Sequence, residues 1–159
     1  MEAPRARILF VCLGNICRSP MAEGAFTHAA REAGLKVDVD SAGTGGWHVG
    51  KPPDPRAIAA TKRHGIDISH LRARQVASDD FMRFTHILAM DARNLSDLIA
   101  LRPEAAEAKL SLLSDCVAGE EGRDVGDPYY GDDDGFERTW REVSAAAEAL
   151  VARLSAGVS

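Results

Sequence analysis

Residues 8–20 decide the fold of this chain, and they read ILFVCLGNICRSP. The apolar run at residues 8–11 predicts a fully buried strand of the kind found in parallel sheets. A short loop follows, and Ser19-Pro20 predicts the start of a helix. A strand, a tight loop and a helix in this order can surround an anion with backbone N–H groups and with the positive end of the helix.

The same stretch carries a thiol and a guanidinium that suit phosphate chemistry. Arg18 can contact two phosphate oxygens with its planar side chain, and cations and helix ends favour the thiolate form of a cysteine such as Cys12. Because phosphoryl transfer depends mainly on positioning and charge neutralisation, we expect Cys12 to attack phosphorus without a metal. The residues expected to bind the phosphate are Leu13, Gly14, Asn15, Ile16, Cys17 and Arg18.

Three other interpretations of this loop do not fit the sequence. A nucleotide-binding P-loop needs Gly-x4-Gly-Lys-Ser/Thr, which the chain lacks. A thioredoxin-like site needs Cys-x-x-Cys, whereas Cys12 and Cys17 are five positions apart. A zinc site needs clustered ligands, and the three cysteines and five histidines are scattered.

Length and composition are those of an ordinary soluble globular protein with a full hydrophobic core. With 159 residues, 45% of them hydrophobic and 27% charged, the chain is expected to form a single domain over residues 1–159. The net charge of −5 argues against binding to nucleic acid, and no apolar run reaches the ~20 residues of a membrane span. Few cysteines and no signal-peptide pattern predict a cytoplasmic protein, and a monomer is the expectation for this size.

Strand and helix patterns alternate along the chain. This alternation predicts a parallel sheet covered by helices on both faces, with the ligand beyond the carboxyl ends of the strands. Cys12, residues 41–43, Asp91 and the loop from Ser114 all fall at such ends. The expected strands are 8–11, 37–41, 86–90 and 109–113, and the expected helices are 20–33, 55–64, a short one from 78, 91–101 and a last one containing 136–154.

The loop before the last helix offers an acid and aromatic side chains. Asp127 precedes a proline and can protonate a leaving oxygen and later activate water, although Asp-Pro also begins many plain turns. Trp47, Tyr129 and Tyr130 can form the aromatic walls of a pocket, or they can be exposed without a function.

Taken together, these segments resemble the low-molecular-weight protein tyrosine phosphatases across essentially the whole chain. The matching segments are residues 11–23, 41–44 and 127–130, and residues 47–50 and 130–132 look like the bacterial, especially actinobacterial, branch. The resemblance implies a four-stranded parallel sheet flanked by helices on both faces, in a Rossmann-like arrangement. It also implies Cys12 as the nucleophile, Arg18 as the phosphate clamp, Asp127 as general acid and then base, phosphotyrosine proteins as substrates, and no cofactor.

The resemblance further implies a polar network that braces the loop. The matching positions are Asn15, Ser19, Ser41 and His70. Asn15 suits a left-handed turn, and Ser19 can donate a hydrogen bond to the thiolate.

The two tyrosines next to Asp127 suggest a form of regulation. Because Tyr129 and Tyr130 adjoin Asp127, a tyrosine kinase that phosphorylates them would add negative charge near the acid.

Three alternatives share part of this pattern. A thioredoxin-linked arsenate reductase needs two further cysteines after the middle of the chain, but residues 81–90 contain none and Cys116 stands alone. A phosphoarginine phosphatase is similar, but the relatives with that activity carry threonine where this chain has Ile16. A phosphate-binding module without turnover is the third, and the joint presence of Cys12, Arg18 and Asp127 argues against it.

Overall fold

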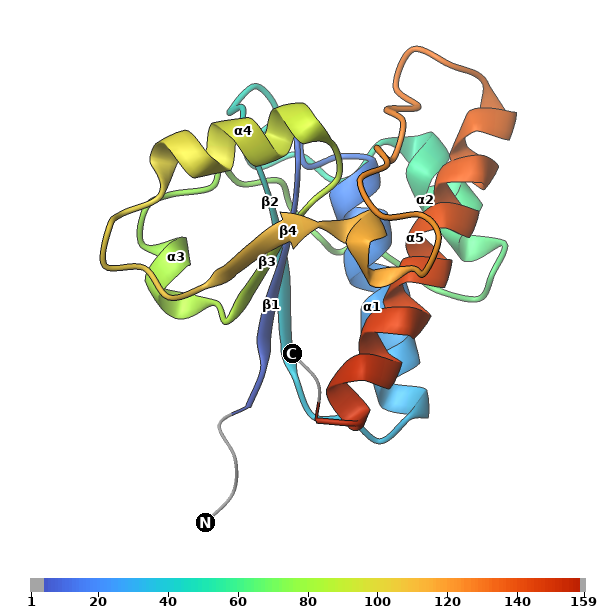
Figure 1. The fold of residues 1–159 in the computed structure, drawn as a ribbon. Coiled ribbons are helices and arrows are strands. Elements are labelled where there is room, and N and C mark those ends of the chain that lie inside the picture. The colour runs from blue at the N-terminus through green and yellow to red at the C-terminus, as the bar shows by residue number, and fades with distance from the viewer. Residues whose placement is uncertain (1–4, 158–159) are drawn as a thin grey trace.

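Four parallel strands form the centre of the molecule in the computed structural model, which describes residues 5–157 (Figure 1). Cys12 pairs with Gly43 and Val11 pairs with Ala89, so the carboxyl ends of neighbouring strands meet at one edge of the sheet. The predicted parallel sheet is therefore confirmed, with the order β2-β1-β3-β4. The strands are β1 (Arg7–Cys12), β2 (Asp38–Gly43), β3 (His86–Ala89) and β4 (Lys109–Leu112).

Strand β1 is apolar because both of its faces are buried. Its residues 8–11 have no exposed surface, and alternate side chains of a strand point to opposite faces of a sheet. Phe10 packs on one face with Phe26, at 5.7 Å between ring centroids, while Val11 joins a second cluster on the other face together with Leu98. The strand that ends in Cys12 is thus anchored in both hydrophobic layers.

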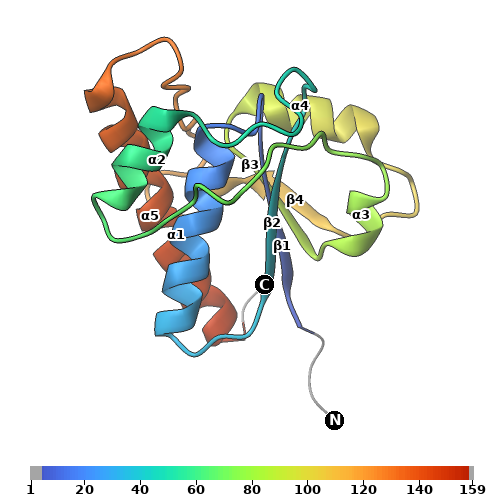
Figure 2. The same cartoon turned by 180° about the vertical axis from the view of Figure 1, so that it is seen from behind.

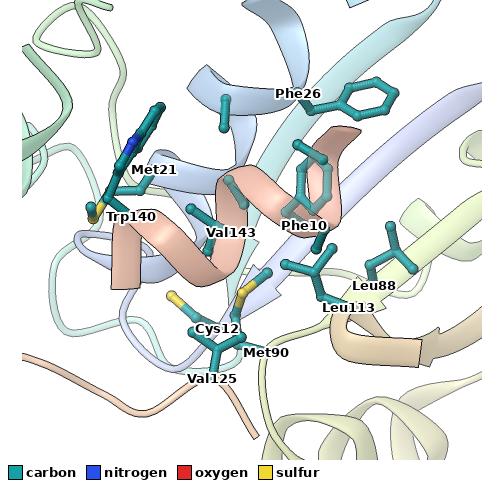
Figure 3. Close-up of a cluster of buried hydrophobic side chains, with 14 of the residues drawn as sticks. Phe10, Cys12, Met21, Phe26, Leu88, Met90, Leu113, Val125, Trp140 and Val143 are labelled. Atoms are coloured by element: carbon teal, nitrogen blue, oxygen red, sulfur yellow. The ribbon is translucent and has the colours of Figure 1, made fainter. Parts of the chain in front are cut away.

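Helices cover the two faces of the sheet, as Figures 1 and 2 show from opposite sides. On one face, α1, α2 and α5 pack against one another, and the other face carries α4 together with the short α3. Figure 3 shows the larger hydrophobic cluster, to which α5 contributes Trp140 and Val143. Within residues 5–157, no helix is both long and apolar enough to cross a bilayer. The helices are α1 (Arg18–Glu32), α2 (Pro55–Lys62), α3 (Asp80–Arg83), α4 (Ala92–Leu101) and α5 (Asp133–Ser155).

Aspartate side chains mark the starts of two helices near the carboxyl edge of the sheet. Asp54 caps α2 by accepting a hydrogen bond of 2.8 Å from the N–H of Arg56. Asp91 caps α4 by accepting one of 2.7 Å from the N–H of Asn94. Such caps satisfy N–H groups that have no partner within the helix, so both helices begin where the sequence predicted.

Most element boundaries differ from the prediction by one or two residues, and two of these differences have a clear structural reason. Helix α1 begins at Arg18 rather than at Pro20, because the carbonyl of Cys17 already accepts a helical hydrogen bond of 3.2 Å from the N–H of Met21. After β4, a 3-10 helix, η1 (Leu113–Cys116), replaces the last predicted strand residue. Leu113 is fully buried, and a buried apolar residue fits the strand pattern and the helix pattern equally well.

Candidate active site

The loop between β1 and α1 turns its carbonyl oxygens outward. The carbonyls of Cys12, Leu13 and Ile16 accept hydrogen bonds of 2.8–2.9 Å from backbone N–H groups outside the loop. In a trans peptide the N–H points opposite to the C=O, so the N–H groups of the residues that follow point toward the centre of the loop. The N–H groups of Leu13, Gly14 and Cys17 thus have the orientation that an anion-binding nest requires, and phosphate binding by them stays a prediction. The outside donors are the N–H groups of Thr44, Gly45 and Asp54.

Asn15 fixes the curvature of this loop. Its backbone has φ +57°, the left-handed conformation expected of it. The Asn15 side-chain amide donates to Ser19 Oγ at 2.7 Å and to Ser41 Oγ at 3.0 Å, and its carbonyl accepts from the N–H of Arg74 at 3.0 Å. The backbone N–H of Asn15 points to Cys12 Sγ at 3.3 Å. One side chain therefore ties the loop to α1, to β2 and to the segment that follows α2.

Cys12 lies at the base of the loop with 2% of its surface exposed. Its Sγ is 3.0 Å from Ser19 Oγ. Ser19 accepts a hydrogen bond from Asn15, and its hydroxyl hydrogen can go to the sulfur or to the carbonyl of Ala42, which lies farther away at 3.5 Å. A thiolate at Cys12 would thus receive two hydrogen bonds, one from this hydroxyl and one from the N–H of Asn15.

Arg18 supplies a buried positive charge beside the thiol. Its Nη1 donates to Asp91 Oδ2 at 2.6 Å and to the carbonyl of Val125 at 3.0 Å, while Nη2 lies 3.5 Å from Asp127 Oδ2. Burial works against the charged form of Arg18, but Cys12, Asp91 and Asp127 together raise its pKa above the usual value. Within residues 5–157, no group of three or more His, Cys, Asp or Glu side chains is placed to hold a metal ion.

A hydrogen-bond chain extends from the loop to a half-buried acid, Glu23. Ser41 Oγ accepts from Asn15 and donates to Glu23 Oε1 at 2.7 Å. Burial raises the pKa of Glu23 to about 7; the hydrogen bond from Ser41 lowers it, Asp40 raises it and Arg74 lowers it. Glu23 was not singled out from the sequence, because an acid in the first turns of a helix is usually solvated.

The structure places His70 apart from the other three residues expected to brace the loop, so its bracing role stays a prediction. His70 is exposed and lines a separate cavity of about 300 Å³ that it shares with Glu23. Among the described residues, the hydrogen-bond partners of Asn15 and Ser41 are instead Ser19, Arg74 and Glu23. The hydroxyl hydrogen of Ser41 goes to the carboxylate of Glu23. The other three predicted bracing residues lie together as expected.

A pocket of about 430 Å³ opens above Cys12. It brings together Cys12, Arg18 and Asp127 with the predicted aromatic residues Trp47 and Tyr129, and Tyr130 also lines it. Trp47 is 73% exposed and Tyr130 is 94% exposed, so both stand at the rim, while Tyr129 is more enclosed at 36%. The carboxylate of Asp127, which is 38% exposed, accepts a hydrogen bond of 3.1 Å from the N–H of Tyr129.

Two further residues contribute to this site: His48, which the sequence analysis did not single out, and Asp91, whose contact with Arg18 it did not predict. His48 lines the pocket, with its ring centroid 6.2 Å from that of Tyr129. Asp91 was expected at this edge of the sheet, but its ion pair with Arg18 spans 73 positions along the chain. His48 directly follows Trp47 in the sequence, and this position next to a predicted wall residue could have indicated that His48 lines the pocket.

Comparison with known proteins identifies the class to which this fold and site belong. The family model described as low molecular weight phosphotyrosine protein phosphatase matches residues 7–159. The chain therefore belongs to this family.

Individual relatives agree with that assignment. The chain is 47% identical over 152 residues to the low molecular weight protein-tyrosine-phosphatase of Streptomyces coelicolor, covering 92% of each chain. The crystal structure of YfkJ from Bacillus subtilis is 38% identical, has a TM-score of 0.91 and is covered over 99% of each chain. A protein tyrosine phosphatase from Entamoeba histolytica, crystallised with Hepes in its active site, is 37% identical with a TM-score of 0.90, covering 96% of this chain and 98% of that one.

Proposed function

We propose that this protein hydrolyses phosphotyrosine in proteins through a phosphocysteine intermediate. The observation that carries the proposal is a single pocket holding a buried thiol, inward-facing amides, a buried arginine and a carboxylate. Membership of the phosphotyrosine protein phosphatase family supports it.

In the first step, Cys12 and Asp127 act on opposite sides of the phosphorus atom. The loop amides and Arg18 bind the phosphate oxygens and neutralise their charge. The thiolate of Cys12 attacks phosphorus and forms an S–P bond as the bond between phosphorus and the tyrosine oxygen breaks. Asp127 donates a proton to that oxygen, so tyrosine leaves as a neutral phenol.

In the second step, water releases the phosphate. Asp127, now a carboxylate, takes a proton from water while the water oxygen attacks phosphorus. The S–P bond breaks and Cys12 leaves as a thiolate. The N–H of Asn15 and the hydroxyl of Ser19, at 3.3 and 3.0 Å from the sulfur, stabilise this leaving group.

Pocket depth supports an aromatic phosphoester as substrate. Cys12 is nearly inaccessible at the base, and Trp47 and Tyr129 stand where they can stack on a phenyl ring. Ile16, which is 9% exposed, adds apolar surface to the lining. A short phosphorylated side chain such as that of serine would bring its backbone against this rim.

The defining experiment compares wild type with Cys12→Ser and Asp127→Ala in the presence of EDTA. With p-nitrophenyl phosphate and a phosphotyrosine peptide, we expect no turnover by Cys12→Ser and about 10²–10⁴-fold lower turnover by Asp127→Ala. A folded wild type that binds phosphate without turnover would support the silent binding module instead.

The two other enzymatic alternatives can be tested with the same preparation. Arsenate reduction needs resolving cysteines, but Cys116 packs against the hydrophobic cluster near η1 and does not line the pocket. Ile16 supports an aryl substrate over phosphoarginine. Faster release of phosphate from a phosphoarginine peptide than from a phosphotyrosine peptide would overturn this choice.

A tyrosine kinase is the proposed regulatory partner. Tyr130 is almost fully exposed beside the pocket, and phosphate there would place negative charge near Asp127. Unchanged labelling by the kinase in Tyr129→Phe and Tyr130→Phe would contradict this proposal.

We also propose that the protein is a cytoplasmic monomer, because a reducing compartment keeps the free thiols of Cys12 and Cys17 available. Cell fractionation would test the location, and light scattering would test the oligomeric state.

A further inference from the structure

Arg56, near the start of α2, donates hydrogen bonds to the loop that carries Asp127. Its Nη2 donates to the carbonyl of Tyr129 at 2.8 Å, and its Nη1 donates to the carbonyl of Gly131 at 3.1 Å. These two carbonyls lie on either side of Tyr130 in the chain. The planar fork of an arginine can hold two acceptors at fixed positions, which a lysine cannot do.

Arg56 is itself held in place from two directions. Asp54 accepts from Arg56 Nε at 3.1 Å and from Nη2 at 3.0 Å. The guanidinium also lies over the ring of the buried residue Phe136, 4.6 Å from the ring centroid. Burial opposes the charged form of Asp54, but its hydrogen bonds with Arg56 lower the pKa of this carboxyl below the usual value.

The same short segment also contacts the cysteine loop. The backbone N–H of Asp54 donates to the carbonyl of Ile16 at 2.8 Å. Helix α2 lies beside the first turns of α5, which follow the acid loop in the chain (Figure 2). Residues 54–56 therefore join the loop that holds the nucleophile to the loop that holds the acid.

Tyr129 links Arg56 to the acid itself. Its N–H donates to Asp127 Oδ1 at 3.1 Å, while its carbonyl accepts from Arg56. Because the carboxylate of Asp127 is 38% exposed and its nearest ion pair is the 3.5 Å contact with Arg18, packing alone does not fix its position. Before Asp127 the loop is held at Val125, through hydrogen bonds with Met90 and Arg18, and after Asp127 it is held by the clamp of Arg56 on Tyr129.

We propose that Arg56 is a positioning residue that holds Asp127 at the distance needed for proton transfer to the leaving oxygen. This inference rests on the proposed phosphatase function. If the acid is displaced, the reaction slows for a substrate whose leaving oxygen must be protonated. The rate should change little for a substrate whose leaving group departs without a proton. The loss in Arg56 variants should therefore depend on the leaving group of the substrate.

The test measures kcat/KM of Arg56→Met on phosphotyrosine and on 2,4-dinitrophenyl phosphate, whose phenolate leaves readily without a proton. We expect a loss of about 10–100-fold on phosphotyrosine, since small misplacements cost this much, and little change on the dinitrophenyl ester. In an Asp127→Asn background, Arg56→Met should cause no further loss. Arg56→Lys, which keeps the charge without the fork, should fall between wild type and Arg56→Met.

Arg63→Met provides the matched control. Arg63 also connects the end of α2 to α5, through an ion pair of 2.7 Å with Glu137, but it does not touch the acid loop. We expect this variant to react with both substrates as wild type does. Equal losses on the two substrates, or a further loss in the Asp127→Asn background, would overturn the role of Arg56. A wild type inactive on both substrates would overturn the proposed function, and this inference with it.

Discussion

Glu23 is a residue whose ionisation depends on the fold. It is half-buried on α1, and its carboxyl oxygen accepts the hydrogen bond of Ser41 at 2.7 Å. Burial raises its pKa from the ordinary value of 4.5 to about 7. The folded protein therefore favours the protonated carboxyl, and this contribution to stability is complete below pH ~4.5 and is lost as the pH rises to about 7.

Glu23→Gln should remove this pH dependence. Glutamine keeps an oxygen that can accept from Ser41 but carries no charge to bury. Relative to wild type, we expect the variant to gain about 1–3 kcal/mol in free energy of unfolding between pH 5 and pH 8. Urea titrations at both pH values measure this difference. Glu32→Gln, an exposed change on the same helix, should show no such gain, and a pH-independent difference for Glu23→Gln would contradict the prediction.

At the scale of elements, the segment between α2 and α3 supports the active-site loop through Arg74. The backbone of Arg74 holds Asn15 and the end of β2, since its N–H donates to Asn15 Oδ1 and its carbonyl accepts from Gly43 at 2.8 Å. Its guanidinium makes two hydrogen bonds of 3.0 Å to Asp80 of α3 and one of 3.0 Å to Asp40 of β2. The ion pairs thus hold the backbone of Arg74 in place, and this backbone is hydrogen-bonded to Asn15 in the catalytic loop.

Asp80→Ala should release this segment. Asp80 is 2% exposed and also accepts from the N–H of Ala77 at 2.8 Å, so its removal leaves several donors without a partner. We expect the free energy of unfolding to fall by about 2–4 kcal/mol, measured by denaturant titration. Asp79→Ala is the matched control, because Asp79 is exposed and makes no side-chain cap hydrogen bond to α3. Equal effects of the two changes would argue against a structural role for the Arg74–Asp80 pair.

Elements and catalytic residues differed in how well the sequence predicted them. The buried run of β1 and the caps at Asp54 and Asp91 are local signals, so β1 and the starts of α2 and α4 could be predicted from the sequence. The pairing of Arg18 with Asp91 could not be predicted, because it depends on how β1 and β3 lie side by side. The exposed position of His70 likewise depends on tertiary packing, which places Glu23 at Ser41 instead.

At the scale of the whole molecule, the active site joins parts that pack on opposite faces of the sheet. Arg18 begins α1 on one face, while Asp91 caps α4 on the other, and their ion pair of 2.6 Å crosses the edge of the sheet. Both hydrophobic clusters include side chains from β1. We therefore expect a ligand bound at Arg18 to stabilise both hydrophobic layers together.

Inorganic phosphate should stabilise the whole chain in one cooperative transition. At about 100 times its Kd, phosphate is expected to add about 2.7 kcal/mol, which corresponds to a rise in Tm of about 5–10 °C for a chain of this size. Differential scanning calorimetry measures both the shift and the number of transitions, and sodium chloride at equal ionic strength is the control. A single transition would also support the expectation of one domain.

Arg18→Met separates binding at the site from general effects of salt. The variant loses the charge that lies beside Cys12 and keeps the loop amides, so most of the shift caused by phosphate should disappear. Cys12→Ser, which keeps Arg18, should retain most of it, because binding does not require the nucleophile. A full shift in Arg18→Met, or two separate transitions of which phosphate moves one, would contradict the view that the site couples both faces of the sheet.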